Sequence, residues 1–366
     1  MLGPNRPSRI AAVAIAALLL AACGGGVPTP ITEAPADPQP APEEAAIAPW
    51  TQEGGPLVVG RGVVVASDVI APLALQEGWF EQAGLDVEVV EERSPVDLFP
   101  LLVSGDIDVM VMAVSAAALS GFVEGVPMRI PATSLVLDAD SCSQVALLGD
   151  PTALDAIDPT DPTTTQGLRI GGTFRSLTSA RYLDALTRQW GITPDDLVLT
   201  EVPSDSHIAA VQTGEVDAVF SFDPFLTLGA ETGDAVVAYP MSEVLEGEIT
   251  AFLLFGSRLL EDRELGARFL AVHLHAVERL NEGATPENVE FLASVTGLEP
   301  DILERMCLPD QVPDGRAHET NLTEIWEFAV ARGDVERVVP ADEVWDHTFL
   351  DRARELLAEG DVVLTD

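Results

Sequence analysis

Short apolar runs and helix-like segments alternate along residues 58–225, and they do so twice in the same order. Each apolar run of strand length leads into a polar, helix-starting residue and then into a segment with helical spacing that a Gly closes. The first series predicts strands at 58–66, 87–90, 107–112 and from 128, with helices at 70–80, 95–103 and 116–123. The second predicts strands at 168–171, 197–201 and 216–220, with helices at 179–190 and 206–212 and another opened by Asp223 and Pro224.

One phrase occurs in both series at the same place. Residues 104–112 read SGDIDVMVM and residues 213–221 read TGEVDAVFS. A Gly precedes each phrase at a similar distance, 21 positions from Gly84 to Gly105 and 23 from Gly191 to Gly214. The repetition therefore predicts two α/β units, each with a parallel sheet. The carboxyl ends of their strands, where ligands bind, are expected to face each other across a cleft.

The remainder of the chain is mostly helical. A strand is expected at 249–255, followed by helices at 264–281, 286–296, 300–306, 322–331 and 345–359. This helical region is expected to pack on the sheet of the first unit. The chain would then pass between the units near 134–150 and 240–256, and these two segments are the candidate hinges.

The first residues have the pattern of an export signal. A basic start precedes the apolar run 11–20, which is too short to cross a bilayer. The run ends in Leu-Ala-Ala-Cys23, which resembles the bacterial lipobox, so residues 1–22 are predicted to be a lipoprotein signal peptide and Cys23 the lipidated residue. An ordinary signal peptide with a chance Cys is the alternative. Residues 24–56, rich in Pro, Ala, Gly and acids, predict a disordered linker that tethers the body to the membrane.

The charge balance excludes one class of partner. The chain has 60 Asp and Glu against 19 basic residues, and every basic residue is Arg. Nucleic acid as a partner is excluded, because binding it requires clustered cations. The acidity fits either a saline habitat or a compositional bias of the lineage, and both stay open. Cys142 and Cys307 could pair outside the cytosol, and the sequence leaves this open too.

Four phrases, at 77–87, 102–118, 168–183 and 212–225, resemble in their order the type II periplasmic binding proteins of ABC transporters. The most similar group is that of the sulfonate, nitrate, taurine and thiamine-precursor binders. The resemblance implies a two-lobed α/β fold (a Venus flytrap) with mixed, mostly parallel sheets and a helical C-terminal region. Lobe 1 would comprise 57–145 and 248–366, and lobe 2 would comprise 146–247.

The resemblance implies an extracytoplasmic solute-binding lipoprotein of an ABC importer rather than an enzyme. Its partners would be a permease, an ATPase and the membrane that holds its lipid, and it would need neither cofactor nor metal. The ligand would be a sulfonate, a nitrate- or bicarbonate-like oxyanion, or a pyrimidine. Two alternatives are a thiamine-pyrimidine-synthesising enzyme on the same fold and a tethered sensory module. No GxSxG, P-loop or HExxH motif favours catalysis.

The candidate ligand site lies in four loops, at 66–70, 112–116, 173–179 and 221–225, where strands end and helices begin. Helix starts offer free N–H donors to an oxyanion. Hydroxyls would add hydrogen bonds, an Arg could grip an oxyanion, acids could bind an amine or ring N–H, and a Phe could stack on a ring. Helix capping, a solvated charge or core packing are the structural alternatives at these positions. The candidates are Ser67, Asp68, Ser115, Arg175, Thr178, Ser179, Phe222 and Asp223.

Overall fold

A computed structural model describes residues 50–62, 68–92, 95–140, 142–172, 174, 176–308, 311–316 and 319–365. Residues Trp50–Asp366 form one compact unit. The expected signal peptide, the lipidation site Cys23 and linker residues 24–49 lie outside the described residues, so those expectations stay predictions. The end of the expected linker is ordered instead: Trp50 packs against the apolar cluster of sheet 1, and Gln52 Oε1 accepts a hydrogen bond from the Asp86 N–H at 2.9 Å.

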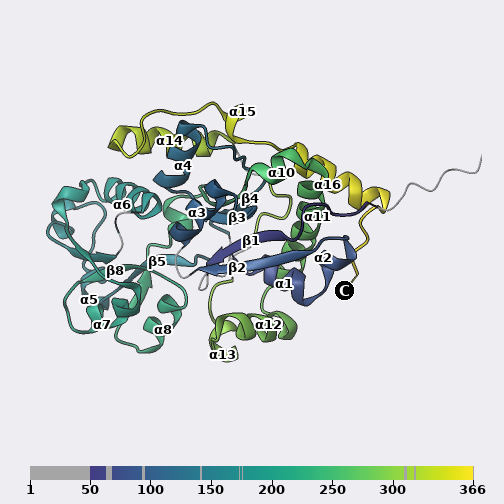
Figure 1. Cartoon of the computed structure of the whole chain (residues 1–366). Helices are drawn as coiled ribbons and strands as arrows, with labels where there is room; N and C mark the ends of the chain where they lie inside the picture. Colours follow the sequence, from purple (N-terminus) through teal and green to yellow (C-terminus); the bar gives the residue numbers. More distant parts are fainter. Residues whose placement is uncertain are drawn as a thin grey trace, which may run out of the picture. The chain divides into compact units, whose positions relative to one another are not determined.

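Two five-stranded sheets organise this unit (Figure 1). Sheet 1 has the order β2-β1-β3-β10-β4, formed by Val87–Glu92, Leu57–Gly62, Val109–Ala113, Ile249–Phe255 and Thr133–Val136. Sheet 2 has the order β7-β6-β8-β5-β9, formed by Val198–Glu201, Arg169–Gly172, Ala218–Phe222, Val145–Gly149 and Val236–Ala238.

The two sheets have the same plan of parallel and antiparallel pairs. In sheet 1, β1 runs parallel to β2 and β3, and β10 runs antiparallel to β3 and β4. In sheet 2, β6 runs parallel to β7 and β8, and β5 runs antiparallel to β8 and β9. The predicted mixed, mostly parallel sheets are therefore present, and β5 and β9 are strands that the sequence pattern did not reveal.

The repeated phrase makes the same contact in both sheets. Asp108 accepts a hydrogen bond from the Val58 N–H at 2.9 Å, and its own N–H donates to Val58 O at 2.8 Å. Asp217 accepts from the Arg169 N–H at 2.8 Å, and its N–H donates to Arg169 O, also at 2.8 Å. The second acid of each phrase, Asp108 or Asp217, thus fixes the start of the neighbouring parallel strand, which explains why the phrase recurs.

The helices follow the expected order with shifted boundaries. Those of the first series and the C-terminal region are α1 Ile70–Gln76, α2 Trp79–Gln82, α3 Pro95–Ser104, α4 Ala116–Glu124, α10 Ser257–Glu261, α11 Arg263–Leu280, α12 Pro286–Thr296, α13 Pro300–Leu303, α14 Glu319–Arg332, α15 Ala341–Val344 and α16 Thr348–Glu359. Those of the second series are α5 Pro151–Asp155, α6 Leu177–Gln189, α7 His207–Gln212, α8 Phe225–Glu231 and α9 Met241–Val244, with 3-10 turns at Pro162–Thr164, Pro194–Asp196 and Ser204–Ser206.

Three boundary predictions are wrong for local reasons. The helix expected over 70–80 breaks into α1 and α2, because Gly78 adopts a left-handed conformation with φ 73°. The strand expected from 128 forms only isolated bridges before β4 begins at Thr133. The helix expected from Ser179 begins two residues earlier, because Ser176 caps it.

Apolar clusters cover both faces of each sheet. Helices α11, α12 and α16 contribute Phe269, Phe291 and Phe349 to the cluster that also holds α1 and β1. Helix α14 contributes Trp326 to the cluster on the other face of sheet 1. The helical region therefore packs on sheet 1, as expected. Trp79 and Trp190 are each 1% exposed and lie in the core.

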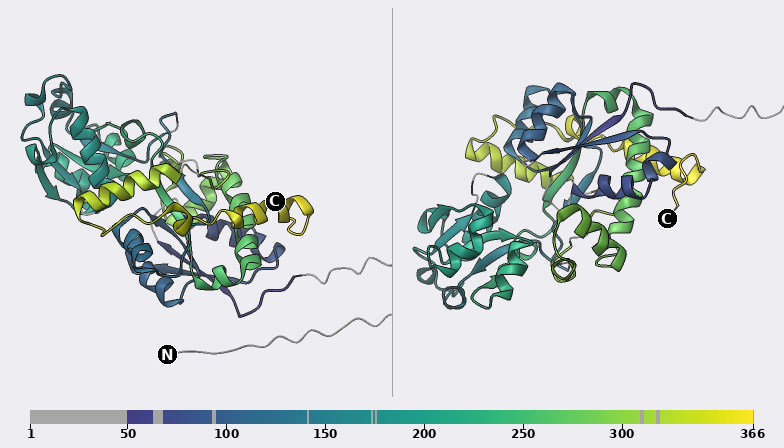
Figure 2. Two further views of the ribbon diagram at one scale, coloured as in Figure 1. Left: turned by 90° about the horizontal axis from the view of Figure 1, so that it is seen from above. Right: turned by 60° about the horizontal axis from the view of Figure 1, so that its bottom comes forward.

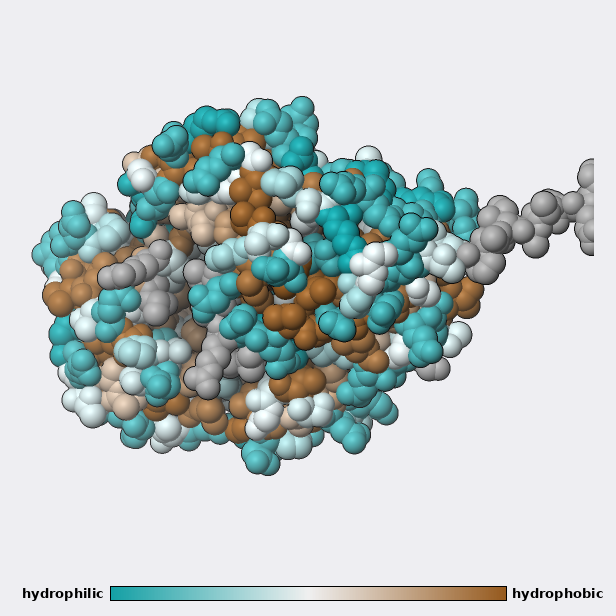
Figure 3. Space-filling view, in the orientation of Figure 1, coloured by the Kyte–Doolittle hydropathy of each residue, from teal (hydrophilic) through white to brown (hydrophobic). Residues whose placement is uncertain are grey.

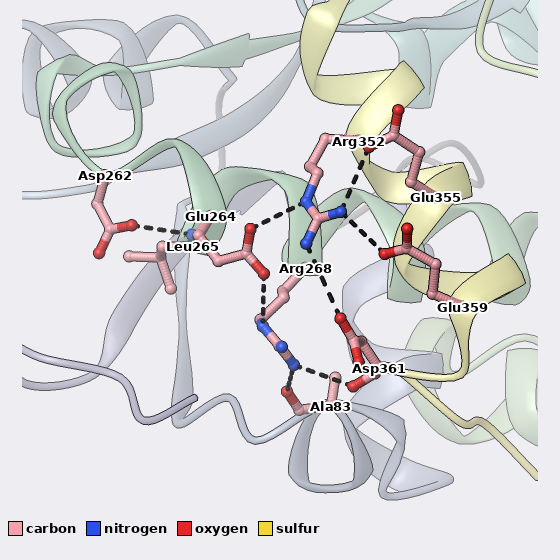
Figure 4. A network of polar contacts seen from close by, with 9 residues as sticks. All are labelled: Ala83, Asp262, Glu264, Leu265, Arg268, Arg352, Glu355, Glu359 and Asp361. Atoms are coloured by element: carbon pink, nitrogen blue, oxygen red, sulfur yellow. Dashed lines mark hydrogen bonds and ion pairs between the residues drawn. The ribbon is translucent and has the colours of Figure 1, made fainter. Parts of the chain in front are cut away.

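Arginine and acidic side chains join two of these helices at their surface (Figure 4). Glu264 of α11 lies 3.3 Å from Arg268 Nε and 3.1 Å from Arg352 Nε of α16. Arg352 also pairs with Glu355 and Glu359 of its own helix, at 3.3 and 3.2 Å. In a chain so poor in cations, Arg352 serves several acids, whereas Arg268 pairs with Glu264 and donates to the backbone carbonyls of Ala83 and Asp361.

The chain passes between the sheets twice. It leaves sheet 1 after β4 and enters sheet 2 at β5, and it returns between β9 and β10. The two passing segments bond to each other: the Leu137 N–H donates to Glu248 O at 2.9 Å, and the Gly247 N–H donates to Leu137 O at 2.7 Å. The passes fall within the segments expected from the sequence.

Candidate functional site

The predicted loops follow the carboxyl ends of neighbouring parallel strands. In sheet 1, β1 ends at Gly62 and β3 ends at Ala113, and in sheet 2, β6 ends at Gly172 and β8 ends at Phe222. In open α/β sheets this end is where ligands bind. Of the candidates, Ser67 and Arg175 lie outside the described residues, so nothing further is derived from them.

Ser115 stands between β3 and α4 as the cap of that helix. It has an extended backbone, and its Oγ accepts a hydrogen bond from the Ala118 N–H at 3.3 Å. The side chain is half-buried. One of the N–H donors in the first turn of α4 is thus already satisfied by the cap.

Helix α6 begins with a serine that sequence reasoning missed. The Ser176 Oγ accepts from the Ser179 N–H at 3.1 Å and lies 2.6 Å from the Ser179 Oγ. Ser179, which is 3% exposed, therefore lies in the first turn of α6 and bonds to the capping residue Ser176. Thr178 beside it is half-buried. The Ser-Leu-Thr-Ser order at 176–179 contained this signal, because Ser favours the N-cap position.

Helix α6 also contacts helix α14, and Figure 2 shows the yellow-green α14 beside the teal part of the chain. Leu177, 3% exposed, belongs to the same apolar cluster as Trp326 of α14. One turn further, Arg181 forms a bidentate pair with Glu248, with Nε–Oε1 and Nη2–Oε2 distances of 2.8 and 2.5 Å, and its guanidinium lies 5.3 Å from the centre of the Phe328 ring. The helix that carries Thr178 and Ser179 is therefore held to the second crossing and to α14.

Both carboxylate oxygens of Asp223 have partners. Oδ1 accepts from the Thr227 N–H at 3.0 Å and from its hydroxyl at 2.7 Å, so Asp223 caps the first turn of α8. Oδ2 accepts from the Cys307 N–H at 3.0 Å. Capping was the structural alternative for this residue, and the bond to Cys307, 84 residues away, had no signal in the sequence.

Aromatic rings gather beside Asp223. Phe222 and Phe225 pack edge to face with centroids 5.5 Å apart, and both are half-buried. His207 lies edge-on to them at 6.2 and 6.0 Å. Its Nδ1 is 2.9 Å from the Ser221 Oγ and its Nε2 is 3.2 Å from Val202 O. Burial lowers the pKa of His207, so the neutral ring backs the two Phe side chains at neutral pH.

Asp68 lies below the end of β1 rather than at a surface. It is 6% exposed, and its Oδ2 accepts from the Gly62 N–H at 3.0 Å. With Arg61 and His273 it lines a cavity of about 20 Å³, which is room for one water molecule. Burial raises the pKa of Asp68 to about 7, against the lowering effects of the Gly62 N–H and of Arg61, and burial lowers the pKa of His273 to about 4.

A groove of about 510 Å³ lies next to Asp223. Helix α8 forms one wall, and the segment that carries Arg305 and Cys307 forms the other. A disulfide joins Cys307 to Cys142 at this place, so the pairing that the sequence left open is present. Among the eight candidate residues, Asp223 lines this groove, Asp68 lines the small cavity, and Ser179 lines a narrow apolar recess between α6 and sheet 2.

The arrangement provides hydrogen-bond donors, hydroxyls and aromatic faces. Among the described residues, no three His, Cys, Asp or Glu side chains form a group that could hold a metal ion. The described helices include none with the length and apolar character of a membrane span.

Two mixed sheets of this plan with flanking helices define the type II periplasmic-binding-protein fold. The chain belongs to the NMT1-like family, whose model matches residues 64–296. The resemblance seen in the sequence is thereby confirmed for family and fold. No curated protein matches the chain significantly in sequence.

Solved structures share the fold at low sequence identity. The alkanesulfonate-binding protein of Xanthomonas axonopodis pv. citri, bound to MOPS, is 20% identical with a TM-score of 0.61, over 81% of this chain and 99% of that one. The periplasmic nitrate-binding protein of Synechocystis PCC 6803 is 12% identical with a TM-score of 0.63, over 86% and 93%. The desulfurization enzyme DSZB is 15% identical with a TM-score of 0.59, over 82% and 98%.

Proposed function

We propose that this protein is the extracytoplasmic solute-binding component of an ABC importer. Its ligand would be a sulfonate, a nitrate- or bicarbonate-like oxyanion, or a pyrimidine of the thiamine-precursor type. The supporting observation is the matched placement of capped helix starts, α4 after β3 and α6 after β6, at the strand ends of two sheets with the same plan. Structural neighbours whose names state a role as binding proteins for alkanesulfonate and nitrate support the same class.

The chemistry of the described residues fits such ligands. The first turns of α4 and α6 present N–H groups and a partial positive charge that suit an oxyanion. Thr178 places a half-buried hydroxyl in the first turn of α6. Phe222 and Phe225 offer half-buried aromatic faces that suit a flat ring.

The two lobes would close on the ligand by rotating about the two crossing segments. We assign 57–145 with 248–366 to lobe 1 and 146–247 to lobe 2, with the paired crossing segments as the hinge. A ligand that contacts helix starts of both lobes stabilises the closed form by its difference in affinity for the two forms. The closed form would then dock on the permease, and the ATPase would drive transport.

The N-terminal pattern supports the location. The basic start, the short apolar run and the lipobox-like residues before Cys23 favour export and lipidation, which would anchor the body to a membrane at its extracytoplasmic face. A lipid anchor and a linker would keep the binding body close to its permease.

An enzymatic function on this fold has a precedent in DSZB, the desulfurization enzyme. The observed Ser–His contact does not favour one here. Ser221 and His207 are 0% and 1% exposed, so a substrate could not reach the hydroxyl. We therefore favour binding without chemistry.

A thermal-shift screen tests the proposal. Full-length protein would be heated with methanesulfonate, nitrate, bicarbonate and 4-aminopyrimidine in turn. A ligand at about 100 times its dissociation constant adds ~2.7 kcal/mol to the free energy of unfolding. If every probe leaves the melting temperature of the folded protein unchanged, the proposed ligand classes are wrong.

The substitution Thr178→Ala tests the site itself. Loss of one hydroxyl contact to the bound ligand is expected to weaken binding of a responding probe by about 5- to 10-fold, since a hydrogen bond contributes ~1 kcal/mol. Isothermal titration calorimetry measures the dissociation constant. Ser294→Ala is the matched control, because Ser294 is a helix hydroxyl of α12 that bonds to Phe291 O and stands at no strand end. Equal affinities for the two variants would argue against a ligand at α6.

A further inference from the structure

The disulfide joins two segments that are far apart in the sequence. Cys142 lies in the first crossing, between β4 and β5, and Cys307 follows α13, 165 residues later. Met306 and Leu308, on either side of Cys307, pack against the apolar cluster of α11, α12 and α16. The segment around Cys307 therefore packs on the helices that cover sheet 1.

The same segment, 304–308, is bonded to elements of sheet 2. The Cys307 N–H donates to Asp223 Oδ2 at 3.0 Å, directly after β8. Arg305 pairs with Glu231 at the end of α8, with Nε and Oε1 2.6 Å apart. Gln144 Nε2, next to β5, donates to Cys307 O at 3.3 Å. These three contacts form a connection between the sheets in addition to the two chain crossings.

The non-covalent contacts of this connection are individually weak. Arg305 and Glu231 are 46% and 40% exposed, and a pair so accessible to water contributes little. The hydrogen bond from Cys307 to Asp223 has a modest net value, because water competes for both groups. The nearby Cys142–Cys307 disulfide strengthens these contacts, because it keeps their partners at a high effective concentration.

We propose that the Cys142–Cys307 disulfide is a positioning element of the proposed ligand site, which holds segment 304–308 against Asp223 and α8. Asp223 stands at the centre of this arrangement, because its other oxygen caps α8 through Thr227. The aromatic pair Phe222 and Phe225 flanks it. The disulfide thus determines where one wall of the site stands relative to sheet 1. This inference rests on the proposed function for its ligand, but the connection itself can be measured without one.

Reduction would release the connection. A dithiol such as dithiothreitol supplies two electrons and two protons: the Cys142–Cys307 S–S bond breaks, both residues become thiols, and the reagent closes to a cyclic disulfide. Only the two hydrogen bonds and the ion pair then hold segment 304–308 to sheet 2. Segment 304–308 and the start of α8 are expected to separate more often.

Hydrogen exchange followed by mass spectrometry tests the connection in the full chain without ligand. In Cys142→Ser/Cys307→Ser we expect exchange at least about 10-fold faster at residues 223–231 as well as 304–308, since both sides lose a common restraint. Residues 350–357 of α16 serve as the internal control and should not change. Asp223→Asn, which keeps the disulfide, should accelerate 304–308 less than the double variant does. Faster exchange confined to 304–308 would overturn the inference.

If the double Cys variant does not fold, reduction of the wild-type protein provides a second test. Wild-type protein treated with dithiothreitol, with its secondary structure checked by circular dichroism, must show the same acceleration at 223–231. Where a probe from the thermal-shift screen binds the oxidised protein, its dissociation constant should rise at least about fivefold on reduction. An unchanged constant would overturn the positioning role. If no probe binds the oxidised protein, the proposed function fails, and the exchange result still decides the inference.

Discussion

At the scale of single residues, several groups act through neighbours that are distant in the sequence. Asp108 and Asp217 hold the starts of adjacent strands, and Asp223 holds both α8 and the Cys307 amide. Asp68 was a candidate to contact ligand, but it lies buried below the end of β1 and accepts from the Gly62 N–H. Because it is buried in the cavity with Arg61 and His273, ionisation of Asp68 is expected to change the free energy of unfolding.

Asp68→Asn should change how stability depends on pH. The folded-state pKa is raised from 3.8 to about 7, so between these values the native state holds a proton that the unfolded chain has lost. Stability therefore falls as pH rises through this window, and Asn removes that loss. Relative to wild type, the variant should gain roughly 2–4 kcal/mol between pH 4 and pH 8.

Urea unfolding at a series of pH values measures this difference. His273 titrates in the opposite sense, since its pKa is lowered to about 4, but it is present in both proteins and cancels from the comparison. Glu91→Gln is the control, because Glu91 is the exposed partner of Arg61, with a side chain 53% exposed. Parallel stability curves for wild type and Asp68→Asn would contradict the assignment.

At the scale of elements, helix α6 is positioned by contacts from both sheets. Its cap lies at the end of β6, and Leu177 packs in the cluster of α14. Arg181 meets Glu248, and the Tyr182 hydroxyl donates to Tyr239 O at 2.5 Å, so both of these contacts end in the second crossing. The orientation of the helix start is therefore linked to the candidate hinge.

The Arg181–Glu248 pair should be costly to break from one side. The two side chains are 13% and 5% exposed, so Arg181→Met leaves a buried carboxylate without its partner, which costs about 3–5 kcal/mol. Arg181→Met/Glu248→Met should recover much of the loss, because the unpaired charge is gone. A double-mutant cycle on urea unfolding measures the coupling.

A second pair on the same helix provides the control. Arg188 and Asp184 are 69% and 33% exposed, so Arg188→Met should cost less than about 1 kcal/mol. Similar losses for Arg181→Met and Arg188→Met would show that the buried pair is no stronger than a surface one.

At the scale of the whole molecule, charge dominates the surface. The chain has a formal net charge of −41, and all of its basic residues are Arg. On the face drawn in Figure 3, hydrophilic residues surround smaller hydrophobic areas. Exposed apolar side chains include Val198 and Leu199 on β7 and Val236 and Val237 on β9, the two edge strands of sheet 2. Repulsion among the acids opposes compaction.

Salt should therefore stabilise the protein. Raising NaCl from about 0.01 M to about 1 M shortens the Debye length from ~30 Å to ~3 Å, which screens repulsion between acids on the surface. The midpoint of urea unfolding should rise over this range and level off at the upper end. Sucrose at matched osmolality is the control for a general solute effect. A flat response to salt would favour compositional bias over adaptation to a saline habitat.

Sequence patterns predicted the fold where the signal was local. Apolar runs gave the central strands, Ser115 marked a helix start, and Gly84 and Gly191, both with positive φ, marked corresponding turns in the two units. Strand β9 escaped prediction because three residues carry little pattern, and β5, an apolar run of five residues, lies in the segment that the sequence had assigned to a crossing between the units. The cap of α6 was placed wrongly because Ser176, Thr178 and Ser179 are all suitable caps, and packing of Leu177 decides among them.

The sequence by itself determined the family, the repeated α/β unit and the strand ends at which a ligand site would lie, because periodicity, caps and turns depend on neighbouring residues. Only the tertiary structure decided the partners of Asp223, the pairing of Cys142 with Cys307, the burial of Asp68 and the meeting of His207 with Ser221. Those contacts join segments that only the folded topology brings together. The type of a side chain does not specify which distant segment will lie next to it.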